Sequence, residues 1–243
     1  LMTDERDEQR FVYRVERDRG DAQFDSAFSP GYFAAELSRD RPAVFVASTH
    51  HWDRMDFDAA TVFDAERRRL AGLLALAPHF SHDPFAEQLA MAADQFVVLP
   101  GSRVEENVMA QAEGSELRSI YAGYHWFGDW GRDTMISLEG LTLATGRYRE
   151  AGAILRTFSH YVRDGLLPNL FPEGERQALY HTVDATFWYF HAIARYVATT
   201  GDRSIIEDLF PVLQSIIEHH LRGTRYNIHV DPADGLVAAG AEG

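Results

Sequence analysis

The spacing of apolar residues changes near residue 60 and divides the chain into two parts. In FVYRVERDRG (residues 11–20), apolar and polar residues alternate, and SPGYFAAELSRDRPAVFVAS (29–48) continues with a Pro-Gly turn, a strand, a polar turn and a second strand. A period of two residues is typical of a half-buried sheet. So few strands are rarely stable alone, so residues 1–58 are predicted to be the end of a sheet domain that begins earlier.

From about Ala60 the apolar residues recur at intervals of three and four, which predicts helices in FDAERRRLAGLLALA (63–77) and DPFAEQLAMAADQFVV (83–98). Ser81 or Asp83 is placed to cap the second helix, and Pro84 fits its first turn. The residues that follow are less regular. A short strand is predicted there at SIYAGY (119–124).

Two similar helical hairpins follow, about 55 residues apart. The predicted helices cover residues 134–144, 147–162, 184–200 and 203–221. Within each hairpin the first helix ends at a Thr-Gly pair, so that Gly146 and Gly201 take the left-handed position that ends many helices. Helices joined in this way predict stacked helical pairs.

Between the hairpins lies RDGLLPNLFPEGERQALYHT (163–182), a long loop rich in Pro, Gly and polar residues. Connections of about 20 residues are uncommon in compact domains and are usually functional. A functional loop is therefore predicted here.

The stretch YHWFGDWGRDTMISLEGL (124–141) crowds aromatic and charged residues around Gly128 and Gly131, at the entry to a predicted helix. One interpretation is structural: Asp129 or Asp133 caps the helix, and the tryptophans belong to the core. The other is functional, because an Arg beside an Asp can donate to and accept from adjacent sugar hydroxyls while an indole supplies an apolar platform. The pattern leaves both open.

A second cluster lies in LYHTVDATFWYFHAIARYV (179–197), on a helix expected to be capped by Thr182. One helical stripe is predicted to be core and contains Val183, Phe187, Phe190, Ala194 and Val197. The neighbouring stripe is polar and aromatic and contains Asp184, Trp188, His191 and Arg195. It is either a binding face or a solvent face whose Asp184 favours the positive end of the helix.

Composition excludes several classes of protein. Of the 243 residues, 46% are hydrophobic, enough for a sizeable core, and the formal net charge of -14 argues against a nucleic-acid partner. The chain has no cysteine, which excludes disulfides and thiolate chemistry and fits a cytoplasmic protein. No apolar run is long enough to span a membrane, and the acidic start is unlike a signal peptide. An opening Leu before Met and an end at AAGAEG suggest a segment of a longer chain.

Motifs for metals, phosphates and serine hydrolysis are missing from the sequence. The pairs His50-His51 and His219-His220 are adjacent, so they cannot easily face one ion, and DPADG (231–235) is a turn pattern. No phosphate-binding glycine loop, HExxH or GxSxG occurs. Neither a metal nor another cofactor is expected.

Three ordered segments nevertheless carry a specific resemblance: YHWFGDWGRDTMISLEGLTLATGRYREA, GLLPNLFPEGERQALYHTVDATFWYFHAI and DPADGLVAAGAEG. Together they resemble the C-terminal domain of glycogen debranching enzymes, the amylo-α-1,6-glucosidase module, over residues 121–243. The resemblance implies a mainly α fold, an (α/α)₆ toroid like that of glucoamylase. Residues 59–243 would form its first part, after the last strands of a β-sandwich in residues 1–58.

The resemblance also implies a substrate and the residues that hold it. The partner would be an α-glucan such as glycogen, limit dextrin or a maltooligosaccharide, cleaved at α-1,6 branch linkages with inversion and release of glucose. The implied substrate-binding residues are Tyr124, Trp126, Trp130, Arg132, Asp133, Asn169, His181 and Asp184. Arg132 and Asp133 would bind hydroxyls of the terminal glucose.

The catalytic acid and base of the family are expected beyond Gly243, which leaves Asp133 and Asp184 as fallback candidates within this chain. About six helices are expected where a complete toroid has twelve. The resemblance therefore implies a glycosidase for the complete protein and leaves the activity of the 243-residue chain open. Two alternatives remain: a trehalase-like or other α-glucosidase, and a helical carbohydrate-binding module without catalysis.

Overall fold

A computed structural model describes most of the chain. The described residues are 6–20, 23–29, 31–40, 42–47, 51, 58–100, 103–112, 114, 116–124, 127–170 and 178–240. By its contacts the chain divides into two compact units, Leu1–Phe63 and Asp64–Gly243.

The N-terminal unit contains one antiparallel strand pair. Strand β1 (Arg6–Val12) pairs with β2 (Phe24–Ser29), and the short helix α1 (Arg14–Arg19) joins them and ends at Gly20, whose φ is 85°. The strand predicted over residues 11–20 is therefore wrong beyond Val12. In the described parts of residues 31–47 the two further predicted strands do not form either: only bridge contacts at Tyr32 and Ser38 occur there. An alternating pattern forms a stable strand only when further strands pair with it through backbone hydrogen bonds.

The next segment contains the two predicted helices. Helix α2 spans Ala59–Leu76, a short 3₁₀ turn spans Pro78–Phe80, and helix α3 spans Pro84–Asp94. The Asp83 side chain accepts hydrogen bonds from the N–H groups of Phe85 and Ala86, at 3.0 and 3.2 Å, and thus caps α3. Of the two capping residues considered, Asp83 is confirmed, and Pro84 occupies the first turn.

A small antiparallel sheet follows, with the order β3-β4-β5. Its strands are β3 (Val97–Val98), β4 (Ser119–Gly123) and β5 (Phe127–Asp129). Strand β4 confirms the strand predicted at SIYAGY. Helix α4 (Val104–Ala112) and strand β5 have no counterpart in the predictions, because both are short and lie among glycines and polar residues.

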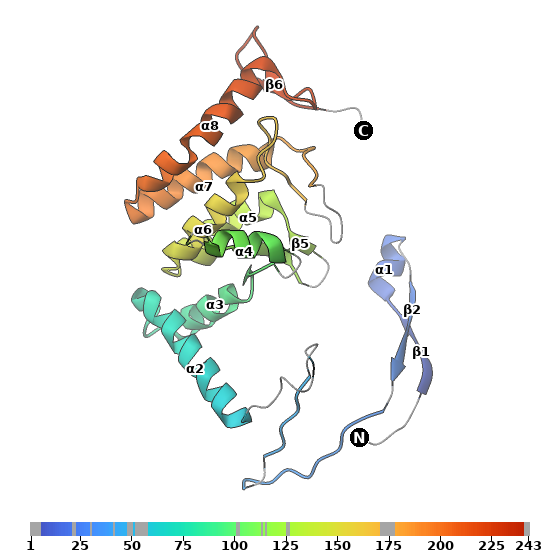
Figure 1. The fold of residues 1–243 in the computed structure, drawn as a ribbon. Helices are drawn as coiled ribbons and strands as arrows, with labels where there is room; N and C mark the ends of the chain where they lie inside the picture. The colour runs from blue at the N-terminus through green and yellow to red at the C-terminus, as the bar shows by residue number, and fades with distance from the viewer. Residues whose placement is uncertain are drawn as a thin grey trace. The chain divides into compact units, whose positions relative to one another are not determined.

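The two predicted hairpins are present and stack on each other (Figure 1). Helix α5 (Gly131–Leu138) continues as a π-helical turn, η3 (Glu139–Leu143), and is followed by α6 (Tyr148–Ser159). The second pair is α7 (Asp184–Thr200) and α8 (Ser204–Arg222). Gly146 and Gly201 have φ values of 73° and 72°, as predicted for residues that end a helix. At Gly146 a Cβ would also lie 2.1 Å from the Leu76 carbonyl oxygen.

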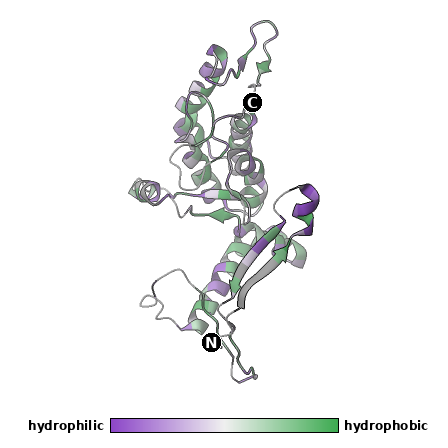
Figure 2. Ribbon diagram, turned by 90° about the vertical axis from the view of Figure 1, so that its right-hand side faces the viewer, coloured by the Kyte–Doolittle hydropathy of each residue, from purple (hydrophilic) through white to green (hydrophobic). Residues whose placement is uncertain are grey.

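The main core lies between these helices. In Figure 2, which is coloured by hydropathy, the helices carry hydrophilic as well as hydrophobic positions. The α7 side of the core agrees only in part with the predicted stripe: Phe190 and Val197 pack against this core, and Val183 packs against a second, smaller cluster. The buried residues of α7 are Ala185, Thr186, Tyr189, Ala192, Ile193 and Tyr196, whereas Phe187 is 40% exposed and Ala194 is exposed. Because α5 and α6 both pack on α7, the buried face is rotated from the stripe that hydropathy alone selects. Val183 rather than Thr182 occupies the N-cap position.

The chain then reverses into a small hairpin. Strands β6 (His229–Val230) and β7 (Val237–Ala238) pair across a turn in which Gly235 has a φ of 74°, confirming the turn predicted at DPADG. In the described parts of the chain there are eight α-helices and three small sheets, which confirms a mainly α fold. None of the described helices is long and apolar enough to cross a membrane.

Candidate functional site

The site begins where the loop of residues 163–170 crosses the first turn of α5. The main-chain oxygen of Asn169 accepts a hydrogen bond from Gly131 N–H at 3.0 Å, and Asn169 Oδ1 accepts one from Arg132 N–H at 3.0 Å. The contact is so close that a Cβ on Gly131 would lie 2.1 Å from the Pro168 carbonyl oxygen. Gly131 is therefore required by this crossing rather than by an unusual backbone angle.

Arg132 then reaches the first residue of α7. Its guanidinium donates two hydrogen bonds to the Asp184 carboxylate, Nε to Oδ2 at 2.5 Å and Nη2 to Oδ1 at 2.9 Å. The two side chains are 39% and 42% exposed, so the pair faces solvent on one side. Planar two-point pairing holds both groups in one orientation and joins the starts of α5 and α7.

This pairing also sets the charge of the site. The hydrogen bonds from Arg132 hold the pKa of the Asp184 carboxyl below its ordinary value of 3.8, although partial burial acts in the opposite direction. The same contact raises the pKa of the Arg132 guanidinium. Asp184 is thus a carboxylate at neutral pH, whereas a general acid needs a raised pKa.

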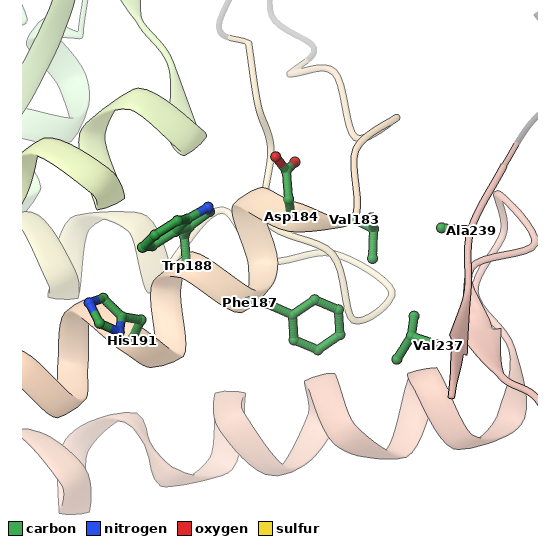
Figure 3. A pocket seen from close by; sticks show the side chains of 7 residues that line it. All are labelled: Val183, Asp184, Phe187, Trp188, His191, Val237 and Ala239. Atoms are coloured by element: carbon green, nitrogen blue, oxygen red, sulfur yellow. The ribbon is translucent and has the colours of Figure 1, made fainter. Parts of the chain in front are cut away.

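Two adjoining hollows open beside Asp184. One, of about 430 Å³, is lined by Arg132, His181, Thr182, Val183, Asp184, Tyr226, Ile228, Ala239 and Gly240. The other, of about 380 Å³, is lined by Val183, Asp184, Phe187, Trp188, His191, Val237 and Ala239. Figure 3 shows the second hollow, with Asp184, Trp188 and His191 following one another along α7, and with Val237 of β7 and Ala239, just after that strand, opposite them. The Trp188 ring meets the His191 ring edge to face at 5.2 Å.

A family model described as Amylo-alpha-1,6-glucosidase matches residues 91–243, which is more than half of the chain and includes all of these residues. The chain belongs to this family. A curated relative is the Glycogen debranching enzyme of Saccharomyces cerevisiae (strain ATCC 204508 / S288c), 35% identical over 125 residues. The match covers 49% of this chain and 8% of that protein, so the chain spans a small part of the relative's length.

In this member of the amylo-alpha-1,6-glucosidase family, the predicted site residues lie in different places. Arg132, His181 and Asp184 line the larger hollow. Three others are grouped at the start of α5: Trp130 at the N-cap position, Asp133 in the first turn, and the buried Asn169 against that turn.

The remaining two predicted site residues are Tyr124 and Trp126. Tyr124 is 52% exposed, and its hydroxyl donates to the Gln95 carbonyl oxygen at 2.6 Å, while both hollows are lined by other residues. Trp126 lies outside the described residues.

The structural interpretation of the first cluster is wrong for Asp129. Its carboxylate does not cap α5; it is buried, pairs with Arg103 and accepts a hydrogen bond from Ser119 Oγ at 2.9 Å. The N-cap residue is Trp130, which makes no side-chain capping bond, and Asp133 lies within the helix. The sequence does not reveal this pairing, because Arg103 lies 26 positions away from Asp129.

The second cluster is divided by its contacts. Asp184, Trp188 and His191 line the smaller hollow, as the polar and aromatic stripe suggests for a binding face. Arg195 instead donates to Glu139 from Nε and Nη2, at 2.9 and 2.5 Å, and joins α7 to η3. That contact holds the pKa of the Glu139 carboxyl below its ordinary value.

Five lining residues were not selected from the sequence: Tyr226, Ile228, Val237, Ala239 and Gly240. All belong to the β6–β7 hairpin or to the segments beside it. The DPADG pattern predicts a chain reversal. It does not predict that the chain after this reversal lies beside the start of α7.

Within the described parts of the chain, no group of three or more His, Asp or Glu side chains is arranged to hold a metal ion. His219 and His220 each contact a carbonyl oxygen of their own helix through Nδ1, Ser215 at 2.7 Å and Ile216 at 2.8 Å. The described side chains that line the site therefore offer hydrogen bonds, charge and aromatic surface.

Proposed function

We propose that this chain is the part of a glycogen-debranching glycoside hydrolase that binds the terminal glucose of an α-glucan. The complete protein would hydrolyse α-1,6-glucosidic branch linkages and release glucose. The observation that carries the proposal is the paired Arg132–Asp184 side chains at the opening of a hollow, in a member of the amylo-alpha-1,6-glucosidase family. A cytoplasmic location is part of the same proposal.

The chemistry of the hollow suits a sugar. A guanidinium donates and a carboxylate accepts, so Arg132 and Asp184, which line the hollow, can satisfy several hydroxyls of one ring. Asp133 lines neither hollow; it lies in the same first turn of α5 as Arg132 and is included because of the family resemblance. His181 and Tyr226, which line the same hollow, add further polar groups. Uncharged ligands rich in hydroxyls are bound by convergent polar groups on a partly apolar surface.

Asp184 is assigned to binding rather than to proton donation, because Arg132 keeps it ionised. Inverting glycosidases need one carboxyl group to protonate the leaving oxygen and another, roughly 6.5 to 9.5 Å away, to activate water. As part of the proposal, both lie in sequence that follows Gly243 in the complete protein. The (α/α)₆ toroid, of which residues 59–243 would be the first part, and the β-sandwich assignment of residues 1–58 also belong to it.

The test is glucose release from glycogen phosphorylase limit dextrin, comparing the 243-residue chain with a chain extended by the downstream coding sequence. Release by the extended chain only supports the proposal. Release by the short chain would contradict the proposal that the acid and base follow Gly243. Asp133 and Asp184 would then be the candidates for catalysis.

A panel of α-glucosides separates the competing activities. If the extended chain cleaves trehalose or another α-glucoside but not limit dextrin, the enzyme is a different α-glucosidase. Binding of maltooligosaccharide without turnover of any substrate would identify a carbohydrate-binding module.

Within the extended chain, Arg132→Ala and Asp133→Asn are expected to lower kcat/KM by orders of magnitude, because contacts to sugar hydroxyls strengthen in the transition state. Glu207→Gln is a matched control, since Glu207 lies exposed on α8 and lines neither hollow. If the two site variants lower the melting temperature while the folded enzyme keeps its rate, their role is structural.

A further inference from the structure

Helix α5 begins without a cap of its own. The first N–H groups of any helix lack partners inside the helix, and a Ser, Thr, Asp or Asn at the N-cap position usually supplies one. Here the N-cap residue is Trp130, whose side chain has no hydrogen-bond acceptor and makes no capping bond. The acceptors for this end of α5 must therefore come from elsewhere in the chain.

Asn169 supplies two of them from 37 positions away. Its main-chain oxygen accepts from Gly131 N–H and its side-chain Oδ1 accepts from Arg132 N–H, each at 3.0 Å. A backbone N–H can only donate, so the oxygen of the Asn169 amide must be the atom that faces it. The residue is 2% exposed.

Asn169 is itself held firmly. Its main-chain N–H donates to the Leu179 carbonyl oxygen at 2.8 Å, and the next residue, Leu170, forms bridges to both Trp130 and Leu179. The preceding residue, Pro168, lies so close to Gly131 that no side chain fits between them. The amide is therefore presented to α5 by a short ordered segment rather than by a free loop.

The capped residue is the one that makes the charge pair of the site. Asn169 fixes the main chain of Arg132, and the guanidinium of Arg132 makes its two-point pair with Asp184. Groups behind a binding residue restrict its orientation and improve its geometry toward the ligand. Asp133 is the next residue of the same turn.

We propose that Asn169 is a positioning residue, which caps α5 from outside the helix and, through the Arg132 N–H, orients Arg132 and its partner Asp184 toward the hydroxyls of an α-glucoside. This inference rests on the proposed function. It assigns to Asn169 a role behind the site, whereas the sequence suggested a side chain in contact with the sugar.

Two variants separate these roles in the extended, active chain. Asn169→Asp keeps an oxygen acceptor for the Arg132 N–H but loses the amide NH₂, and Asn169→Ala loses both. A positioning role predicts a fall in kcat/KM on limit dextrin of about 10²-fold for Asn169→Ala, because small misplacements of binding groups are costly. Asn169→Asp should recover most of that loss. Asn107→Ala, on α4, is a matched control that should leave kcat/KM unchanged.

Two outcomes would overturn the proposal. If Asn169→Asp, compared at equal folded fraction, is as impaired as Asn169→Ala, an oxygen acceptor for the Arg132 N–H is not what the site needs and the positioning role is refuted. If both variants lower the melting temperature but the folded enzyme keeps wild-type kcat and KM, Asn169 is only structural.

A second measurement does not depend on activity. In the 243-residue chain, the Arg132 Nε–H proton should give an NMR signal protected from solvent exchange by the bond to Asp184. The signal should be lost in Asp184→Asn, weakened in Asn169→Ala and kept in Asn169→Asp. If the Arg132 Nε–H signal in Asn169→Ala is the same as in the wild type, Asn169 does not position Arg132. The expected signals together with an extended chain that cleaves no glycoside would instead refute the proposed function and leave the structural role of Asn169 standing.

Discussion

The Asp184 carboxyl illustrates how one contact sets the charge of a residue. Its pKa is lowered chiefly by the hydrogen bonds from Arg132. A carboxyl whose folded pKa lies below its unfolded value stabilises the fold above the unfolded pKa, and this contribution is lost as the pH falls through the folded pKa. The relevant window therefore begins near the ordinary value of 3.8 and extends below it.

We predict that wild type is more stable than Asp184→Asn at neutral pH and that this difference shrinks as the pH falls below about 4. Because both side chains are about two fifths exposed, solvent screening limits the difference to about 1 kcal/mol or less. Urea unfolding of both proteins at several pH values measures it. A difference that stays constant through the acidic window would show that the ion pair does not stabilise the fold.

Gly131 provides a second prediction for a single residue. Gly131→Ala should destabilise the protein by about 1–3 kcal/mol, because the new Cβ would collide with the Pro168 carbonyl oxygen and main-chain atoms cannot easily move aside. Gly140→Ala is the matched control: an added Cβ meets nothing within 4 Å, so this variant should be neutral or slightly stabilising. Urea midpoints compare the two, and equal effects would contradict the close crossing of loop and helix.

Among the elements, α8 has two different apolar faces. One face is buried in the helical unit and includes Ile205, Leu209 and Ile216. The other carries Phe210, Ile217 and Leu221, which are 58%, 53% and 64% exposed. Spacings of seven and four residues place these three on one side of the helix. Large exposed apolar side chains in a row favour association between molecules.

We therefore predict that the 243-residue chain self-associates at micromolar concentration and that replacing Phe210, Ile217 and Leu221 by Ser reduces this association. Light scattering after size exclusion measures the mass, and circular dichroism should show unchanged helix content. Ser at Ile205 and Ile216 is the control, and it should unfold the helical unit because both residues are buried. Equal association of the exposed-face variant and wild type would contradict the prediction.

At the scale of the whole molecule, the buried residues are concentrated in the second unit. Both clusters of buried apolar residues in the described chain lie between Val97 and Ile228. In the first unit, Phe33 and Phe45 contact each other at 5.1 Å but are 67% and 69% exposed. The helical unit thus has a core of its own, as an independently folding domain does.

It follows that removing residues 1–58 should change the melting temperature of the helical unit by no more than about 3 °C, roughly the effect of 1 kcal/mol in a domain of this size. Differential scanning calorimetry of the shortened and full chains tests this. A much larger fall would mean that the first unit stabilises the helices, and the predicted boundary after residue 58 would have to be abandoned.

The sequence by itself determined the features that neighbouring residues encode. Gly146 and Gly201 end their helices because a left-handed residue favours glycine, and Asp83 caps α3 because its carboxylate reaches N–H groups two and three residues ahead. The repeated helical hairpins, the mainly α class and the family resemblance could likewise be read from periodicity and ordered motifs.

Only the tertiary structure decided which distant residues meet. The Arg132–Asp184 pair joins positions 52 apart, and Asn169 caps a helix whose own N-cap residue cannot. The rotated core face of α7 and the buried pairing of Asp129 with Arg103 have the same origin. Helix ends depend on local backbone geometry, whereas these contacts depend on how packed elements and a crossing loop bring remote side chains within hydrogen-bonding distance.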